Sequence, residues 1–242
     1  MPSDRPNIAW TAAAALLLAG AWSGFQPDAG NSLALPPPML KGVLSLEEVL
    51  AGRRSARQFS DRPLTPQQIG QLCWAGQGIT DLARGYRTAP SAGALYPVSL
   101  YVVTASGVDR YDPERHRLVR QLSADVRPAL SRAALGQESV RVAPACLAIT
   151  AVVERTARKY GERAERYCLL EAGHIAQNIL LQATSLGLAG VPVGAFDDQQ
   201  VAAVLRLPAG QHVLYLLPIG WPATRDDHST ATTRPTAGTV SE

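Results

Sequence analysis

Cysteine is scarce in this chain of 242 residues, in which only Cys73, Cys146 and Cys168 occur. Each cysteine lies in an apolar stretch, and the spacing of the three matches no zinc-binding pattern. An odd number of cysteines in such positions argues against a disulfide framework. We therefore expect free structural thiols, which behave as small apolar side chains in a core.

The chain also lacks a large excess of charge of either sign. The 23 Lys and Arg residues nearly balance the 20 Asp and Glu residues, which gives a formal net charge of +3. So small an excess, without a basic cluster, does not favour a nucleic-acid-binding surface, although it suits a small anionic ligand. The densest charged run, residues 155–166, alternates in sign and is typical of a solvated helix face.

The motifs of several enzyme classes are missing as well. We find no Ser-His-Asp set and no pair of carboxylates placed for acid–base catalysis. The glycine-rich segment 187–196 has neither the GxGxxG spacing of a dinucleotide fold nor the Lys-Ser/Thr of a P-loop. A metal site is not expected, because His174 has one nearby carboxylate on its helix face and no second histidine within reach.

The composition predicts one globular domain, because 46% of the residues are hydrophobic and 18% are charged. Residues 8–25 contain no charge, so we expect residues 1–26 to be a signal peptide or a membrane anchor. An apolar helix packed on the domain is the alternative. The twin-arginine signal of folded, cofactor-loaded exports is missing. We predict a periplasmic, exported or membrane-anchored protein rather than a cytoplasmic one.

The other boundaries also follow from composition. Residues 27–44 are predicted to be a linker rich in Pro and Gly, and residues 45–222 to be the domain. Residues 223–242 are rich in Ser and Thr and lack an apolar period, so we expect a loose C-terminal arm.

Capping residues and β-branched runs predict the elements of the domain. Ser45 is placed to cap a helix over 44–52, and Thr65 followed by Pro66 is typical of the start of a second helix. Strands are predicted at 98–104, 145–153 and 213–219, a hairpin over 109–119, and further helices over 164–187 and 198–205. This mixture favours an α+β fold.

The predicted helix over 164–187 is apolar on almost every side, so we expect it to be buried. A narrow polar stripe remains on it, formed by Tyr167, Glu171, His174, Asn178 and Gln182. Each stripe residue needs a partner, because an unpaired buried polar group costs about 1–3 kcal/mol. The stripe is interpreted either as the wall of a ligand site or subunit seam, or as a satisfied structural network.

An arginine-rich segment follows the first predicted helix, with the sequence Arg53-Arg54-Ser55-Ala56-Arg57. The planar guanidinium group suits phosphate, and alternate residues of an extended segment point to the same side. Spacing alone leaves a solvated basic turn as an equal alternative. Two segments of small residues, 90–97 and 187–196, would let the backbone approach a flat ligand closely.

These segments occur in the order RRSARQF, PSAGALYP, EAGHIAQN, GVPVGAFDD and LLPIGWP. Together they resemble the nitroreductase superfamily, and the second and third are similar to its branch of SagB/ThcOx-type azoline dehydrogenases. The resemblance implies an α+β fold with a mixed central sheet flanked by helices. It also implies a homodimer with exchanged arms, FMN at the dimer interface and a ping-pong reaction on a small-molecule substrate. NAD(P)H is a candidate electron donor.

The family's binding residues are transferred by position. The resemblance implies that Arg53, Arg54 and Ser55 hold the FMN phosphate and ribityl chain, and that Arg57 lies near the flavin N1 and C2 carbonyl. Residues expected to reach the flavin or ribityl chain of the other subunit are Pro90, Ser91, Ala92 and Gly93. Residues expected to pack on the flavin ring through backbone groups are Pro192, Val193, Gly194 and Ala195.

Two positions depart from the family pattern. Ala94 stands where other nitroreductases commonly have Asn, which removes one polar contact to the flavin. Trp221 follows Gly220, so the role of the C-terminal basic residue on the phosphate is assigned to Arg225 or Arg234.

Few acid–base residues are needed, because a flavin supplies the redox chemistry itself. Tyr96 and His174 are the predicted proton donors near the substrate, and a core histidine is the alternative for His174. We predict an FMN-dependent oxidoreductase that transfers electrons between a small-molecule donor and an organic acceptor. The alternatives are an azoline dehydrogenase in peptide modification, a non-catalytic flavin-binding module, and a membrane-tethered structural protein.

Overall fold

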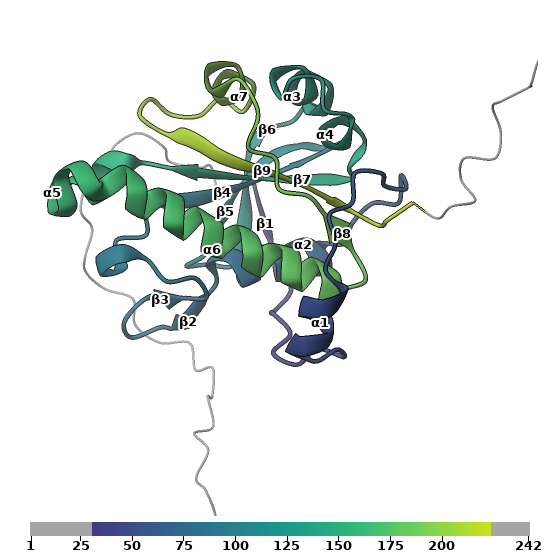
Figure 1. Ribbon diagram of the computed structural model, residues 1–242, viewed down its shortest axis with the longest axis horizontal. Helices are drawn as coiled ribbons and strands as arrows, with labels where there is room; N and C mark the ends of the chain where they lie inside the picture. Colours follow the sequence, from purple (N-terminus) through teal and green to yellow (C-terminus); the bar gives the residue numbers. More distant parts are fainter. Residues whose placement is uncertain (1–30, 224–242) are drawn as a thin grey trace, which may run out of the picture.

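The computed structural model describes residues 31–223 (Figure 1). The predicted signal peptide or anchor and nearly all of the predicted C-terminal arm, with Arg225 and Arg234, lie outside the described residues. Among the helices of residues 31–223, none is both long enough and apolar enough to cross a membrane.

A seven-stranded sheet with the strand order β1-β6-β5-β4-β7-β9-β8 forms the centre of the fold. The strands are β1 (Ser32–Ala34), β4 (Val98–Thr104), β5 (Gly107–Asp112), β6 (Arg117–Leu122), β7 (Ala145–Ala151), β8 (Ala189–Gly190) and β9 (His212–Gly220). These strands pair antiparallel, and an isolated bridge between Ser55 and Gly190 is parallel. The predicted α+β fold is confirmed, and this bridge is where parallel pairing enters the sheet.

Helices cover both faces of the sheet (Figure 1). On one face lie α2 (Pro66–Gln77) and the long α6 (Ala164–Ser185), and on the other lie α3 (Arg127–Ala133), α4 (Glu138–Val142) and α7 (Asp198–Val204). The remaining elements are α1 (Leu46–Gly52), α5 (Val153–Tyr160) and a small hairpin of β2 (Ile79–Asp81) and β3 (Tyr86–Arg87). The predicted helices and strands are all present, whereas β1, β8, α3, α4 and the β2–β3 hairpin were not predicted.

The central strands are buried on both faces. In β7, Leu147 and Ile149 point to the core under α2 and α6, while Cys146 and Ala148 point to the core under α3 and α7. A strand covered on both sides reads as a continuous apolar run rather than as an alternating one. The three cysteines are buried and free, as expected, and burial raises the pKa of the Cys146 thiol to about 12.

Both predicted helix starts are confirmed by capping boxes. The Ser45 hydroxyl accepts from the Glu48 N–H at the start of α1, and the Thr65 hydroxyl accepts from the Gln68 N–H at the start of α2. In both helices the third residue reaches back to the backbone of the cap, so two otherwise unpaired donors are satisfied.

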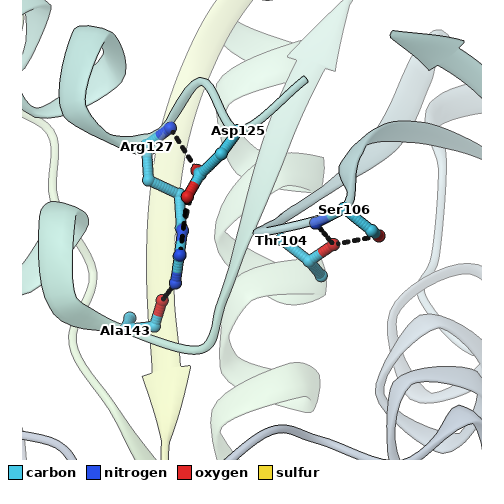
Figure 2. A network of polar contacts seen from close by, with 5 residues as sticks. All are labelled: Thr104, Ser106, Asp125, Arg127 and Ala143. Atoms are coloured by element: carbon cyan, nitrogen blue, oxygen red, sulfur yellow. Dashed lines mark hydrogen bonds and ion pairs between the residues drawn. The ribbon is translucent and has the colours of Figure 1, made fainter. Parts of the chain in front are cut away.

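An arginine at the start of α3 joins this helix to the end of α4 (Figure 2). The Arg127 guanidinium donates to both oxygens of Asp125, at 2.9 and 2.7 Å, and to the Ala143 carbonyl at 3.2 Å. The hydrogen bonds from Arg127 lower the pKa of the Asp125 carboxyl. Nearby, the Thr104 and Ser106 hydroxyls are 2.8 Å apart and close the β4–β5 turn. The bidentate contact therefore anchors a layer whose helices are short.

The predicted linker is in part a structural element of the domain. Its residues 32–34 form β1, which pairs with β6 along the edge of the sheet, and Leu35 enters the core at 8% exposure. The Pro36 carbonyl lies 2.9 Å from the His116 ring, and the Gln71 side chain binds both the N–H and the carbonyl of Met39. Proline has no N–H to donate to a neighbouring strand, so the prolines that follow β1 suit the edge of the sheet, where side chains such as His116 and Gln71 hold the segment. The boundary at residue 45 is therefore wrong.

We predict that the segment before residue 45 stabilises the domain. Leu35→Ala should lower the free energy of unfolding by about 2–4 kcal/mol, because it removes a buried side chain. Leu33→Ala, the matched control, is 53% exposed and should change it by less than about 0.5 kcal/mol. Urea denaturation measures both. Equal stability for chains that begin at Asn31 and at Lys41 would restore the boundary at residue 45.

Candidate functional site

The arginine segment and the second small-residue segment lie side by side. Ser55 forms its bridge with Gly190, and the Ala56 N–H donates to the Gly190 carbonyl at 3.2 Å. Further along, the Ser60 N–H donates to the Trp221 carbonyl at 3.0 Å. Two segments expected to bind the same cofactor are thus adjacent within one chain.

The three arginines of the first segment differ in their contacts. Arg54 donates to the carbonyls of Ala51 and Arg53, at 3.0 and 2.8 Å, and so satisfies the end of α1. The guanidinium groups of Arg53 and Arg57 form no hydrogen bond or ion pair with any described residue. Arg53 has an extended backbone and Ser55 forms the bridge, so alternation along the segment places these two side chains on one side, and Arg57 follows two residues later. The segment offers an anion two cations and a hydroxyl, while Arg54 has a structural role.

The loop after β8 exposes backbone at a few positions. Pro192, Gly194 and Ala195 are exposed, whereas Val193 is 4% exposed and belongs to the core under α3 and α7. The Val193 N–H and carbonyl both bond to Leu216, at 2.8 and 3.0 Å. Val193 was expected to contact the flavin through its backbone, but both of its backbone groups are already bonded to Leu216, and it anchors its neighbours.

The first small-residue segment has a strained backbone. Ala94 and Tyr96 both have positive φ, at 54° and 47°, and Gly93 has φ of 60°. For a residue other than glycine this conformation costs about 1–3 kcal/mol, and such strain gathers at functional sites. The Ser91 hydroxyl accepts from the Tyr96 N–H at 2.9 Å and stabilises the turn.

Two side chains that the sequence analysis missed lie over this turn. A methyl group added at Gly93 would stand 2.7 Å from the Tyr160 hydroxyl and 2.9 Å from the Lys159 ammonium nitrogen. Glycine is therefore required at position 93 both by its φ and by this approach. Lys159 and Tyr160 belong to the charged run that was interpreted as solvated, and no signal within that run separates them from their neighbours.

The two predicted proton donors differ in their surroundings. The Tyr96 hydroxyl accepts from the backbone N–H of Arg87 at 3.2 Å, and the Tyr96 ring lies 4.5 Å from the Arg87 guanidinium. His174 is exposed on α6 and forms no hydrogen bond or ion pair with the described residues. The alternative interpretation of His174 as a core histidine is wrong for this chain.

The rest of the polar stripe on α6 is largely a structural network. Asn178 donates to the Thr88 carbonyl at 3.3 Å, and Gln182 accepts from Gln71 at 3.0 Å. The ring of Tyr167 packs edge-on against Tyr160, with 5.0 Å between centroids.

Glu171 is the exception in this stripe, because it is 3% exposed and one of its carboxylate oxygens has no hydrogen-bond partner. Burial raises its pKa to about 7, although Ser91, Arg87 and Gln77 act in the opposite direction. Glu171 therefore titrates near neutral pH directly behind the strained turn.

The two halves of the predicted cofactor site lie at different places along α6. Gly52, which precedes the arginine segment, packs near Thr184, whereas Ser91 contacts Glu171. A helix rises 1.5 Å per residue, so positions 171 and 184 are about 20 Å apart. Within one chain, residues 90–93 are therefore remote from residues 53–57.

Comparisons with known proteins place this chain among the oxidoreductases. A family model described as "Nitroreductase family" matches residues 50–221, so the chain belongs to the nitroreductase family. A Methanocaldococcus jannaschii protein named "Putative nitroreductase MJ1384" is 42% identical over 197 residues, which is 79% of this chain and 98% of that protein.

Two solved structures extend the comparison. A "putative nitroreductase" from Ralstonia eutropha JMP134 is 28% identical with a TM-score of 0.73, covering 84% of this chain and 97% of its own. The NADPH:FMN oxidoreductase from Vibrio harveyi, complexed with NAD+, is 27% identical with a TM-score of 0.56 and covers 74% of this chain and 69% of its own.

We predict that Glu171 makes stability depend on pH. Its pKa is about 7 in the folded state against an ordinary value of 4.5, so the folded protein binds this proton more tightly. The stabilisation is complete below pH 4.5 and is lost as the pH rises through 7. Between these two pH values the free energy of unfolding of the wild type should fall by up to about 3 kcal/mol more than that of Glu171→Gln.

Urea denaturation at pH 5 and pH 8 tests this expectation. Glu165→Gln, an exposed position on the same helix, is the matched control and should follow the wild type. The same pH profile in the wild type and in Glu171→Gln would contradict the burial of an ionisable carboxyl at this position.

Proposed function

We propose that the chain is an FMN-dependent oxidoreductase whose flavin site is completed by a second copy of the chain. The observation behind this proposal is the separation of about 20 Å along α6 between the residues that the family resemblance assigns to one cofactor. Two copies with antiparallel α6 helices would bring residues 90–93 of one beside residues 53–57 of the other.

The exposed apolar surface supports a homodimer. Large exposed apolar side chains lie at both ends of α6, in the segment before α1 and on α1 at one end and on α6 itself at the other: Leu40, Val43, Leu44, Leu46, Leu50, Leu169 and Leu170. Val43 is 97% exposed, next to a cavity of 460 Å³ between the segment 39–46 and α6. Large apolar patches are uncommon on the surface of a monomer, and a second copy with an antiparallel α6 would cover both regions.

The residues present fit FMN. Arg53 and Ser55 would bind the phosphate, because a free guanidinium and a hydroxyl on one side form charge-assisted contacts to an anion. Gly194 and Ala195 would let the backbone approach the flat ring, since they are exposed and have little or no side chain. Gln137 donates to the Ala195 carbonyl at 2.8 Å and holds this loop in place.

When bound, FMN would supply the redox chemistry of a ping-pong reaction. The similarity to the Vibrio harveyi protein, whose name includes NADPH and FMN, supports this cofactor and a nicotinamide donor. Lys159 and Tyr160 would hold or move a proton at the substrate, because their tips lie over Gly93 of the segment assigned to the flavin. The substrate would be a small organic molecule, and export or anchoring through residues 1–26 remains part of the proposal.

An azoline dehydrogenase is the second candidate. Removing two hydrogens from an azoline ring requires a base for one of them as a proton, and Lys159 with Tyr160 offers such a group beside Gly93. A peptide containing thiazoline would be oxidised by this enzyme, whereas the reductase would consume NAD(P)H with a nitro compound or quinone. Assaying both substrates on one flavin-loaded preparation separates the two activities.

Arg53 and Arg57 should differ in what they do to the flavin. Arg53→Ala should weaken FMN binding about ten- to a hundredfold, because a charge-assisted contact is worth roughly 1.5–3 kcal/mol. Arg57→Ala should mainly lower the flavin midpoint potential, because a cation near N1 and the C2 carbonyl favours the more negative reduced form. About 30 mV of this two-electron potential corresponds to ~1.4 kcal/mol.

Fluorescence titration with FMN and redox titration measure the two effects. Arg132→Ala is the matched control, since Arg132 is exposed on α3 and outside the site. If Arg53→Ala shifts the potential while Arg57→Ala does not, the two assignments are reversed. If neither variant changes affinity or potential, the arginine segment is a solvated turn.

A further inference from the structure

A polar cleft lies between β4 and β5, where the two strands diverge. Their ladder ends with the pair Tyr101–Arg110, so Val98–Leu100 and Tyr111–Asp112 are not paired with each other. The cleft between them has a volume of 350 Å³, and its wall also includes Gln77, Tyr96 and Arg155. This volume lies within the range of small-molecule sites.

Arginine dominates the wall of this cleft. Arg115 and Arg117 are both paired with Asp112, at 3.7 and 2.9 Å, so one of their two charges is offset. The other three arginines of the wall are Arg87, Arg110 and Arg155. They form no ion pair within residues 31–223, and Glu114 is the remaining carboxylate of the wall.

The orientation of these groups is partly fixed in advance. Arg155 donates to the Tyr96 carbonyl at 2.7 Å, and Arg87 stacks on the Tyr96 ring and donates to the Gln77 side chain. The Nε of Arg87 is buried and has no hydrogen-bond partner. Glu171 also acts on the charge of Arg87, but it is not part of the cleft wall. The Arg87 Nε–H is therefore a buried donor that lacks an acceptor.

We propose that this cleft binds the carboxylate or phosphate group of a small anionic molecule, with Arg110 and Arg155 as its main cationic contacts. Guanidinium groups are suited to both oxyanions, because their planar fork can donate two parallel hydrogen bonds. Tyr96 lines the cleft and stands three residues from Gly93, in the segment assigned to the flavin. The anionic molecule is the organic substrate, and its acidic group lies in the cleft. This assignment rests on the proposed function.

Calorimetric titration of the purified protein with inorganic phosphate and, separately, with malonate tests the anion site and distinguishes the two oxyanions. At least one of them should bind the wild type, and Arg110→Gln and Arg155→Gln should each weaken that binding about tenfold. Arg155 is exposed, so Arg155→Gln should fold even if Arg110→Gln does not. Arg132→Gln is the matched control. No binding by the wild type, or equal weakening in Arg132→Gln, would overturn the site.

Kinetics with a pair of acceptors tests the assignment to the substrate. The ratio of kcat/KM for 4-nitrobenzoate to that for nitrobenzene should fall about tenfold in Arg155→Gln and be retained in Arg132→Gln. A ratio unaffected by Arg155→Gln, in a protein that binds the anion, would overturn the substrate assignment. Failure to reduce either acceptor would count against the proposed function, while the calorimetric result would still decide whether the anion site exists.

Discussion

The close packing of α2 on α6 determines where the groups of the candidate site can lie. A methyl group at Gly76 of α2 would stand 2.9 Å from Ile179 and 3.2 Å from Ile175, so a larger residue would have to displace these side chains. Because the helices are this close, Gln71 reaches Gln182 near one end of the contact, and Gln77 faces Glu171 near the other. Helix α6 therefore contacts both of the segments assigned to the cofactor and keeps them apart.

Stability is reduced where function is proposed. Glu171 is a buried ionisable group, and the turn in front of it contains two non-glycine residues with positive φ. Natural proteins accept such local costs mainly where a site needs a defined geometry. The remainder of the molecule follows the ordinary rules, with capped helices, alternate core faces in β7 and a bidentate ion pair at α3.

The elements with strong local signals could be predicted, and those that depend on distant partners could not. Ser45 and Thr65 are recognisable caps, and α6 is apolar over many turns. By contrast, β1 is recognisable only once β6 is beside it, and the prolines that follow it, residues 36–38, resemble a linker. At the site, sequence reasoning found the segments but could not tell that the Arg54 guanidinium and the Val193 backbone already form hydrogen bonds within the chain. Lys159 and Tyr160 were missed because only the fold brings them to Gly93.

The central claim is that two chains share each flavin site, and complementation between two defective variants tests it most directly. Arg53→Ala would impair one half of the site and Ala92→Trp the other, so both homodimers should bind FMN more weakly and lose most of it during gel filtration. A mixed dimer, purified by two different tags, contains one site with both halves intact. We predict that it binds about one FMN per two chains, measured by absorbance after gel filtration. A mixed preparation that binds no more FMN than its parents would contradict the shared site.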